Sequence, residues 1–281
     1  MERKIRNSVL KGLLSALVII SCSLDANARK LVILHTNDTH SQIEEIRSGN
    51  GIGKGGVHQR AEFFARIKAE NENVLILDAG DYNQGTPYFT IFKGDLEVQV
   101  MNELGYEVVT LGNHEFDNGL DELARRLKNA KYTTVCANYD FTDTPLRDIV
   151  KPYVIIERGG LKIGIFGITT DLKTLVAKQN VKGMVYKDAY QVTDATALKL
   201  RNELGCDLVI ALTHIGYSGY PDQLSDINLA QKTENVDIII GGHSHTFLKS
   251  EKIYKNRAGK DVVIVQAGAQ GEYVGQLEIE Y

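Results

Sequence analysis

The 281-residue sequence contains little proline and little cysteine, with four prolines and three cysteines. It also lacks low-complexity runs and internal repeats at the period of a solenoid protein. These absences argue against a disordered tail and against a repeat architecture. With 43% apolar and 24% charged residues, the composition is that of an ordinary globular protein. The length suits one large domain or two small ones.

Excess positive charge is absent as well. The formal net charge is −4 and the isoelectric point is about 6.0, so the chain is not basic enough to bind duplex nucleic acid or an acidic membrane surface. A pocket for an anion would therefore have to draw its positive charge from bound metal rather than from lysine and arginine.

No apolar run of membrane-spanning length opens the chain. A basic start with Arg3, Lys4, Arg6 and Lys11 is followed by an uncharged, mostly apolar stretch of 13 residues, Gly12 to Leu24. This stretch is shorter than a spanning helix needs, and the pattern is typical of a secretory signal. The sequence therefore predicts an exported protein, either periplasmic or anchored to the membrane through a lipid.

Two processing sites compete in this segment. Ala26-Asn27-Ala28 has the small-x-small pattern of ordinary signal cleavage, which would make residues 1–28 the signal peptide. Ile19 to Cys22 resembles the bacterial lipobox, in which case the signal is 1–21 and Cys22 is lipidated. We favour lipidation, because a cysteine directly after such an apolar run is otherwise an odd choice.

The other two cysteines, Cys136 and Cys206, have a spacing that fits no metal motif, and each lies beside an apolar run. Buried thiols are the preferred interpretation. A disulfide between them is the alternative in an oxidising compartment.

From residue 31 onward, short apolar runs alternate with amphipathic stretches. Uninterrupted runs rich in valine and isoleucine predict strands that are covered on both faces. These runs are Leu31–Leu34, Val74–Leu77, Val108–Leu111, Val135–Ala137, Ile163–Ile168, Leu208–Leu212, Val236–Ile240 and Val262–Val265. The helix-like stretches are Val57–Asn71, Leu96–Leu104, Gly119–Asn129 and Ala189–Leu204. This alternation indicates a layered α/β fold.

The pattern changes near the C-terminal end. Ile253–Tyr254 and Val262–Val265 flank Asn256-Arg257-Ala258-Gly259, which predicts a hairpin. Gly275–Tyr281 then alternates apolar and polar residues like a final strand. No linker-like composition follows residue 30, so residues 29–281 are predicted to form one domain.

Five of the apolar runs lead into residues that can bind metal. These residues are Asp38 and His40, Asp81, Asn113 and His114, His214, and finally His243 and His245. Ligands of α/β sheets bind beyond the carboxyl ends of the strands, so five such ends can converge on one place. Residues two apart in extended chain point to the same side, as Asp38 and His40 would. The glycines before Asp81, Asn113 and His243 permit tight turns.

The ligand set contains only nitrogen and oxygen donors. Imidazoles and carboxylates without a thiolate favour Zn, Mn, Fe or Co over a structural cysteine–zinc site or a calcium cage. Up to seven ligands are too many for one tetrahedral ion and suit two divalent ions that share a carboxylate. Such a site holds a hydroxide and a phosphate well, as two-metal hydrolysis requires. His35 and His58 fit no such pattern and are predicted to lie in the first strand and on the first helix.

The motifs resemble those of a known family. ILHTNDTH, GKGGVHQRAEFFARIK, VLILDAGDYNQGTP, NELGYEVVTLGNHEFDNG, GLKIGIFGITT, LVIALTHIG and DIIIGGHSHTF are similar to the metallophosphatase domain of the bacterial 5′-nucleotidase / UDP-sugar hydrolase family, within the calcineurin-like phosphoesterase superfamily. The resemblance runs from Leu31 to Tyr281. It implies a four-layer α/β/β/α sandwich of two mixed sheets flanked by helices, with a dimetal site at strand ends.

The resemblance also assigns roles. One metal ion would be held by Asp38, His40, Asp81 and His245, and the second by Asp81, Asn113, His214 and His243, with Asp81 bridging. Asn113 and His114 would contact the substrate phosphate, and His114 with Asp117 resembles the family's catalytic dyad. The implied reaction is hydrolysis of a phosphomonoester, above all a 5′-nucleotide, by attack of a metal-bridging hydroxide on phosphorus.

The sequence departs from the family pattern in two respects. Position 245 is an amide in several members, whereas here it is histidine, which leaves the metal preference and the subfamily open. The family's C-terminal nucleotide-binding domain is also absent from this sequence. A 2′,3′-cyclic nucleotide phosphodiesterase or a generalist phosphoesterase is one alternative. The other is the catalytic half of a split nucleotidase that needs a separate C-terminal domain partner.

Overall fold

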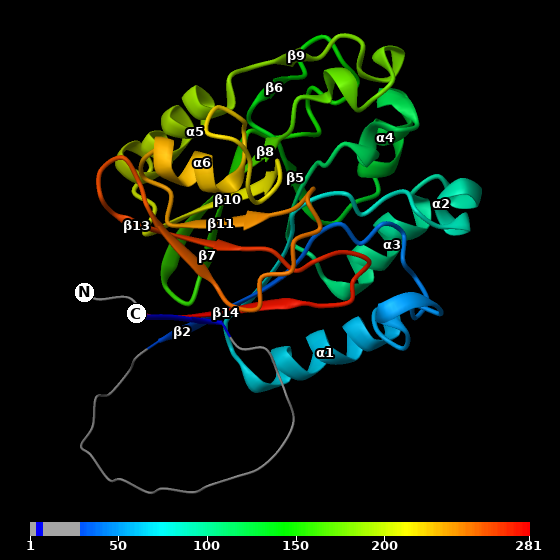
Figure 1. Ribbon diagram of the computed structural model, residues 1–281, viewed down its shortest axis with the longest axis horizontal. Coiled ribbons are helices and arrows are strands. Elements are labelled where there is room, and N and C mark those ends of the chain that lie inside the picture. Colours follow the sequence, from blue (N-terminus) through cyan, green and yellow to red (C-terminus); the bar gives the residue numbers. More distant parts are fainter. Residues whose placement is uncertain (1–3, 8–28) are drawn as a thin grey trace, which may run out of the picture.

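The computed structural model describes residues 4–7 and 29–281 (Figure 1). The predicted signal and Cys22 lie outside these residues, apart from Lys4–Asn7, which forms the edge strand β1. Signal cleavage and lipidation therefore stay predictions. None of the helices in the described part of the chain combines the length and the apolar character that a membrane crossing requires.

The described residues form two six-stranded sheets and one two-stranded sheet. In order across the first sheet, the strands are β1 (Lys4–Asn7), β14 (Gly275–Glu280), β2 (Lys30–Thr36), β3 (Val74–Asp78), β4 (Val108–Thr110) and β5 (Thr133–Val135). Those of the second are β12 (Lys252–Lys255), β13 (Asp261–Val265), β11 (Ile238–Gly241), β10 (Leu208–His214), β8 (Leu161–Thr169) and β7 (Tyr153–Arg158). The small sheet pairs β6 (Tyr139–Asp140) with β9 (Val185–Tyr186).

Both large sheets are mixed. Strands β2 to β5 run parallel, whereas β14 is antiparallel to β2 and β1 is antiparallel to β14. In the second sheet β8, β10, β11 and β13 run parallel, and β7 and β12 are antiparallel at the two edges. The carboxyl ends of the parallel strands in each sheet therefore point the same way.

Helices cover the outer face of each sheet (Figure 1). Figure 1 labels α1 (Val57–Glu70), α2 (Pro87–Phe92), α3 (Asp95–Leu104), α4 (Gly119–Leu127), α5 (Ala189–Leu198) and α6 (Asp226–Lys232). Single 3-10 turns lie at Gly49–Gly51, His114–Phe116, Leu172–Thr174 and Lys178–Val181, and a π-turn at Lys199–Glu203 extends α5. Side chains of α1, α3 and α4 pack on the first sheet, and those of α5 and α6 pack on the second.

Strand β2 explains why the apolar runs show no alternation. Leu31 and Ile33 point into the core between the two sheets, and Val32 and Leu34 point into the core beneath α1, α3 and α4. Successive side chains of a strand face opposite sides, so a strand buried on both faces must be apolar throughout. The predicted four-layer α/β/β/α sandwich is confirmed.

Most element predictions are confirmed, with differences where the pattern was weak. The predicted run Val135–Ala137 overlaps β5 only at Val135, because the strand runs from Thr133 and ends at Val135. Strand β7 and the short helices α2 and α6 were not predicted. His35 lies in β2 and His58 on α1, as expected.

Cys136 and Cys206 are both buried free thiols, so the alternative of a disulfide between them is wrong. Burial raises the pKa of Cys136 to about 11, which makes that thiol a poor nucleophile.

Candidate metal centre

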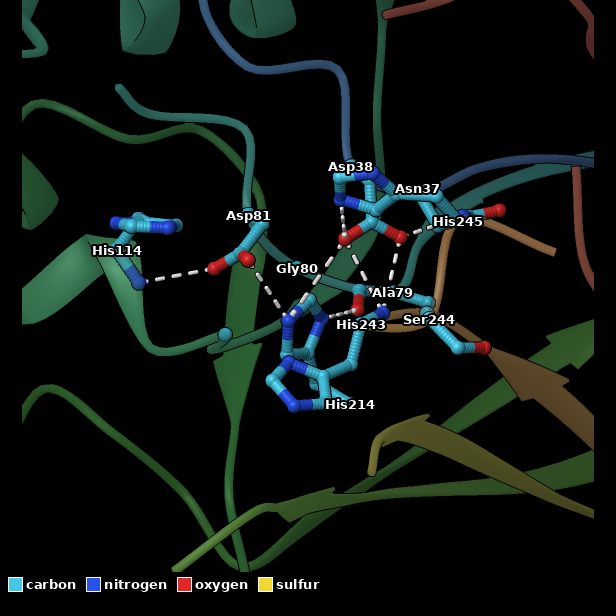
Figure 2. A network of polar contacts seen from close by, with 12 residues as sticks. Asn37, Asp38, Ala79, Gly80, Asp81, His114, His214, His243, Ser244 and His245 are labelled. Carbon is cyan, nitrogen blue, oxygen red and sulfur yellow. Dashed lines mark hydrogen bonds and ion pairs between the residues drawn. The ribbon is translucent and has the colours of Figure 1, made fainter. Parts of the chain in front are cut away.

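The loops that leave β2, β3, β4, β10 and β11 converge at one place (Figure 2). Asp38 and His40 follow β2, Asp81 follows β3, and His214 is the last residue of β10. His243 and His245 follow β11. The predicted convergence of the five strand ends is therefore found in the fold.

Three groups of ligand atoms have the proximity that metal binding requires. The members of each group offer atoms within 4.8 Å of one another. The groups are Asp38 with His40 and His245, His40 with Asp81 and His114, and Asp81 with His214 and His243. Asp81 belongs to two groups and His40 to two, so the groups form one continuous cluster.

His214 lies between the two aspartates. Its Nδ1 donates to the carbonyl oxygen of Ala79 at 2.8 Å, which leaves Nε2 as the nitrogen that can bind a metal ion. That Nε2 is 2.9 Å from Asp81 Oδ2 and 3.8 Å from Asp38 Oδ1, and it makes no hydrogen bond. A buried imidazole nitrogen beside two carboxylate oxygens is the arrangement that a divalent cation satisfies.

The charges of these residues depend strongly on one another. Burial opposes protonation of His214, but the carboxylates of Asp81 and Asp38 outweigh it and raise the pKa of His214 to about 10. Burial likewise opposes ionisation of Asp81, but His214 outweighs it and holds the pKa of Asp81 well below its ordinary value. The cluster thus favours a positive charge between two carboxylates, whether the charge is a proton or a cation.

Asp38 is held by backbone and amide donors. Its carboxylate accepts from the amide of Asn37 at 2.6 Å and from the backbone N–H of His243 at 3.0 and 3.1 Å. The same Asn37 amide donates to the carbonyl oxygen of Gly268 at 2.7 Å. These contacts join the loop after β2 to the loops after β11 and β13, as Figure 2 shows in part.

Five of the seven predicted ligands have left-handed backbone, which non-glycine residues seldom adopt. Their φ angles are 50° at Asp38, 49° at His40, 54° at Asp81, 78° at His243 and 53° at His245. Such conformations cost free energy and persist only where the surrounding structure enforces them. The fold therefore holds these five residues in place at a local energetic cost.

The remaining donors also fit a metal ion. His40 Nε2 lies 2.9 Å from His245 Nε2, and His245 Nε2 lies 3.4 Å from Asp38 Oδ1. The side-chain oxygen of Asn113 is buried without a hydrogen-bond partner. An orphaned amide oxygen, together with the imidazoles and carboxylates of the cluster, matches the donor set predicted from the sequence.

His114 and Asp117 form the predicted pair. His114 Nδ1 lies 2.7 Å from Asp117 Oδ2, and the His114 backbone N–H donates to Asp81 Oδ1 at 2.9 Å. The hydrogen bond to Asp117 raises the pKa of His114 above its ordinary value. With Nδ1 bound to Asp117, Nε2 is the nitrogen that remains for a ligand.

Three buried polar residues of the site were not predicted. Asn37 precedes the first ligand, Gln266 accepts from the backbone N–H of Thr246 and from Ser244 at 3.0 Å, and Glu115 binds backbone N–H groups. Asn37 and Glu115 lie in two of the family-like motifs, ILHTNDTH and NELGYEVVTLGNHEFDNG, whereas Gln266 lies in none of them. His58 lies away from the cluster and pairs with Glu62 at 3.3 Å on α1.

A two-sheet α/β sandwich with carboxylates and imidazoles gathered at its strand ends is the architecture of a metal-dependent hydrolase. The family model for calcineurin-like phosphoesterases matches residues 31–247. The chain belongs to the calcineurin-like phosphoesterase family. The family and the ligand groups together indicate that it uses divalent metal ions.

The chain is also similar to individual 5′-nucleotidases. It is 38% identical to a snake venom 5′-nucleotidase of Naja atra, covering 90% of this chain and 50% of the relative, and 34% identical to the Homo sapiens 5′-nucleotidase, covering 91% and 47%. The chain thus spans about half the length of these curated relatives.

Solved structures give the same result. A 5′-nucleotidase precursor from Thermus thermophilus superimposes with a TM-score of 0.80 at 35% identity, covering 89% of this chain and 51% of that one. The calcineurin-like phosphoesterase YfkN of Bacillus subtilis superimposes with a TM-score of 0.72 at 26% identity, covering 90% and 86%. The predicted family and fold are confirmed.

Proposed function

We propose that this protein hydrolyses phosphomonoesters with two divalent metal ions, and that its substrates are 5′-nucleotides. The observation that carries the proposal is the position of Asp81, which lies in two of the three ligand groups. A carboxylate shared in this way is the bridge that a two-metal site needs.

The donors divide into two sets of four around that bridge. Asp38, His40 and His245 would complete one set with Asp81, and Asn113, His214 and His243 the other. Each set then has two imidazole nitrogens and two oxygens, a mixture suited to Zn, Mn, Fe or Co. The unpartnered oxygen of Asn113, and the position of His214 Nε2 at 2.9 Å from Asp81 Oδ2, support this division.

Two such ions would supply Lewis acidity that activates water and neutralises the phosphoryl oxygens. The protein adds a proton donor at a fixed place. Asp117 accepts from Nδ1 of His114, which fixes the ring, and Nε2–H can then donate to a phosphoryl oxygen as negative charge develops there.

The nucleotide is proposed from the relatives, because the 5′-nucleotidases above share the family and a third or more of the residues. The test compares AMP, UDP-glucose and p-nitrophenyl phosphate as substrates of the purified protein with added Mn²⁺ or Zn²⁺. Preference for AMP supports the proposal. Metal-dependent hydrolysis of p-nitrophenyl phosphate without hydrolysis of AMP or UDP-glucose would instead indicate a generalist phosphoesterase.

The alternative substrate class is a 2′,3′-cyclic nucleotide, which the histidine at position 245 permits. YfkN, to which the chain is similar, is named a trifunctional nucleotide phosphoesterase. A 2′,3′-cyclic nucleotide added to the same comparison decides between the two. Release of a 3′- or 2′-nucleotide from it at a rate above that for AMP would assign the protein to the cyclic phosphodiesterases.

Export, lipidation and a separately encoded C-terminal partner remain proposals from the sequence. Adding a purified C-terminal nucleotidase domain and measuring AMP hydrolysis tests the last of these. A large rise in rate supports a split enzyme, and an unchanged rate contradicts it.

A further inference from the structure

Glu115 has the one side chain with polar atoms in the segment Gly112 to Glu115 to which the proposed reaction gives no role. Its side chain is fully buried. The carboxylate accepts three backbone hydrogen bonds, from Gly112 at 2.6 Å, from Asp81 at 2.9 Å and from Asn83 at 3.2 Å. No ligand or solvent contact is needed to satisfy it.

The three donors come from two different loops. Asp81 and Asn83 belong to the loop after β3, and Gly112 belongs to the loop after β4 that continues into Asn113. The Glu115 carboxylate therefore joins the loop of the proposed bridging ligand to the loop of the proposed amide ligand. The two loops are also joined by a direct hydrogen bond, because the backbone N–H of His114 donates to Asp81 Oδ1 at 2.9 Å.

The two loops are in close contact at this point. A Cβ atom on Gly112 would stand 2.2 Å from Asp81 Oδ1, so the loops leave no room for a side chain between Gly112 and the Asp81 carboxylate. The main chain of Glu115 is itself anchored, because its carbonyl oxygen accepts from the buried guanidinium of Arg126 at 2.9 Å.

We propose that Glu115 is a positioning residue that sets the separation of Asp81 and Asn113, and with it the spacing and affinity of the two metal ions. This inference rests on the proposed two-metal function. Both side-chain oxygens must accept, because all three partners are donors and they are divided between Oε1 and Oε2. A glutamine amide has one acceptor oxygen, and its NH₂ group would face a backbone N–H and leave that donor buried and unpaired.

The test uses Glu115→Gln in the full chain, with Glu122→Gln as a matched control. The control makes the same substitution on the exposed face of α4, where Glu122 pairs with Arg125 at 3.0 Å. Titration calorimetry with Mn²⁺ measures the affinity of metal-free protein, and electron paramagnetic resonance of the loaded protein reports the exchange coupling between two Mn²⁺ ions.

We expect Glu115→Gln to weaken Mn²⁺ binding by about 10- to 100-fold and to change the exchange-coupled spectrum, with Glu122→Gln like the wild type. Unchanged affinity and spectrum, with only a lower melting temperature, would overturn the positioning role. If Glu115→Gln does not fold, Glu115→Asp is measured in the same way, because it keeps the carboxyl group but is too short to reach both loops. Failure of the wild type itself to bind any of Mn²⁺, Zn²⁺, Fe²⁺ and Co²⁺ would instead overturn the proposed function.

Discussion

His214 Nε2 lies 2.9 Å from Asp81 Oδ2, and the same imidazole is fixed by its bond to the Ala79 carbonyl oxygen on the other side. The two residues come from different sheets, since Asp81 follows β3 and His214 ends β10. The site is therefore assembled across the interface between the sheets, and it forms only when both sheets are packed together.

Asp81→Asn tests whether the shared carboxylate bridges two ions. The amide is nearly the same size but uncharged, so we expect loss of metal-dependent hydrolysis by at least about 1,000-fold, given the several kcal/mol that metal charge contributes to the transition state. Steady-state kinetics with Mn²⁺ and calorimetric metal binding are the measurements. Asp95→Asn is the control, because Asp95 is a surface residue paired with Arg125. Full activity in Asp81→Asn would remove the basis of the assignment.

His114→Ala separates proton donation from metal binding. We expect kcat to fall by about 100- to 1,000-fold, the usual cost of removing one transition-state donor. Metal content, measured by elemental analysis of the purified variant, should stay at the wild-type level. His58→Ala provides the comparison on the surface of α1. A parallel loss of metal and activity would show that His114 is a ligand, in keeping with its place in one ligand group.

Because the ring of His35 is buried, we expect the stability of the protein to depend on pH. Its ring lies on the same face of β2 as Leu31 and Ile33, is 1% exposed, and has no hydrogen-bond partner at either nitrogen. Burial lowers the pKa of His35 from 6.5 to about 4. Between these values the unfolded chain binds a proton that the folded chain does not, so stability falls as the pH falls through this range.

His35→Leu should remove this contribution. As the pH drops from 6.5 to about 4, the free energy of unfolding of the wild type should fall relative to that of His35→Leu by up to about 1.4 kcal/mol per pH unit. Urea denaturation at several pH values measures the difference, with His58→Leu as the control. A difference between wild type and variant that stays constant with pH would contradict the assignment.

Cys22→Ser distinguishes the two processing routes. If Cys22 is lipidated, cells given labelled palmitate should label the wild type and not the variant. Mass spectrometry of the mature wild-type protein gives the second reading. A mature chain that begins at Arg29 and carries no lipid would show that cleavage follows Ala28.

Sequence reasoning succeeded where burial produced an uninterrupted apolar run, or where metal-binding residue types followed such a run. The central strands were predictable because both faces of runs such as Val74–Leu77 are buried. The clustering of aspartates and histidines was predictable because each of these residues follows such a run. Strand β7 was missed because it lies at a sheet edge and is mostly half-buried. The helices α2 and α6 are too short to show a 3.6-residue period.

The supporting residues of the site were harder to predict for a physical reason. Glu115 acts on backbone N–H groups of Asp81 and Asn83, which any residue type except proline would offer. Asn37 and Gln266 likewise bind main-chain atoms of distant loops. Such contacts depend on how the chain is folded in space, and they place almost no constraint on the partner's side chain.

The pairing of β14 with β2 has a consequence for how the protein folds. His35 lies opposite Gly275 and Lys30 lies opposite Glu280, so the first long strand of the sheet gains this partner only when one of the last segments of the chain has been synthesised. Contacts of such long sequence separation slow folding. During synthesis the emerging chain should therefore keep one edge of β2 unpaired, a state in which chaperones can bind it. Ribosome-bound chains truncated before residue 275 should be more sensitive to protease than chains that include β14.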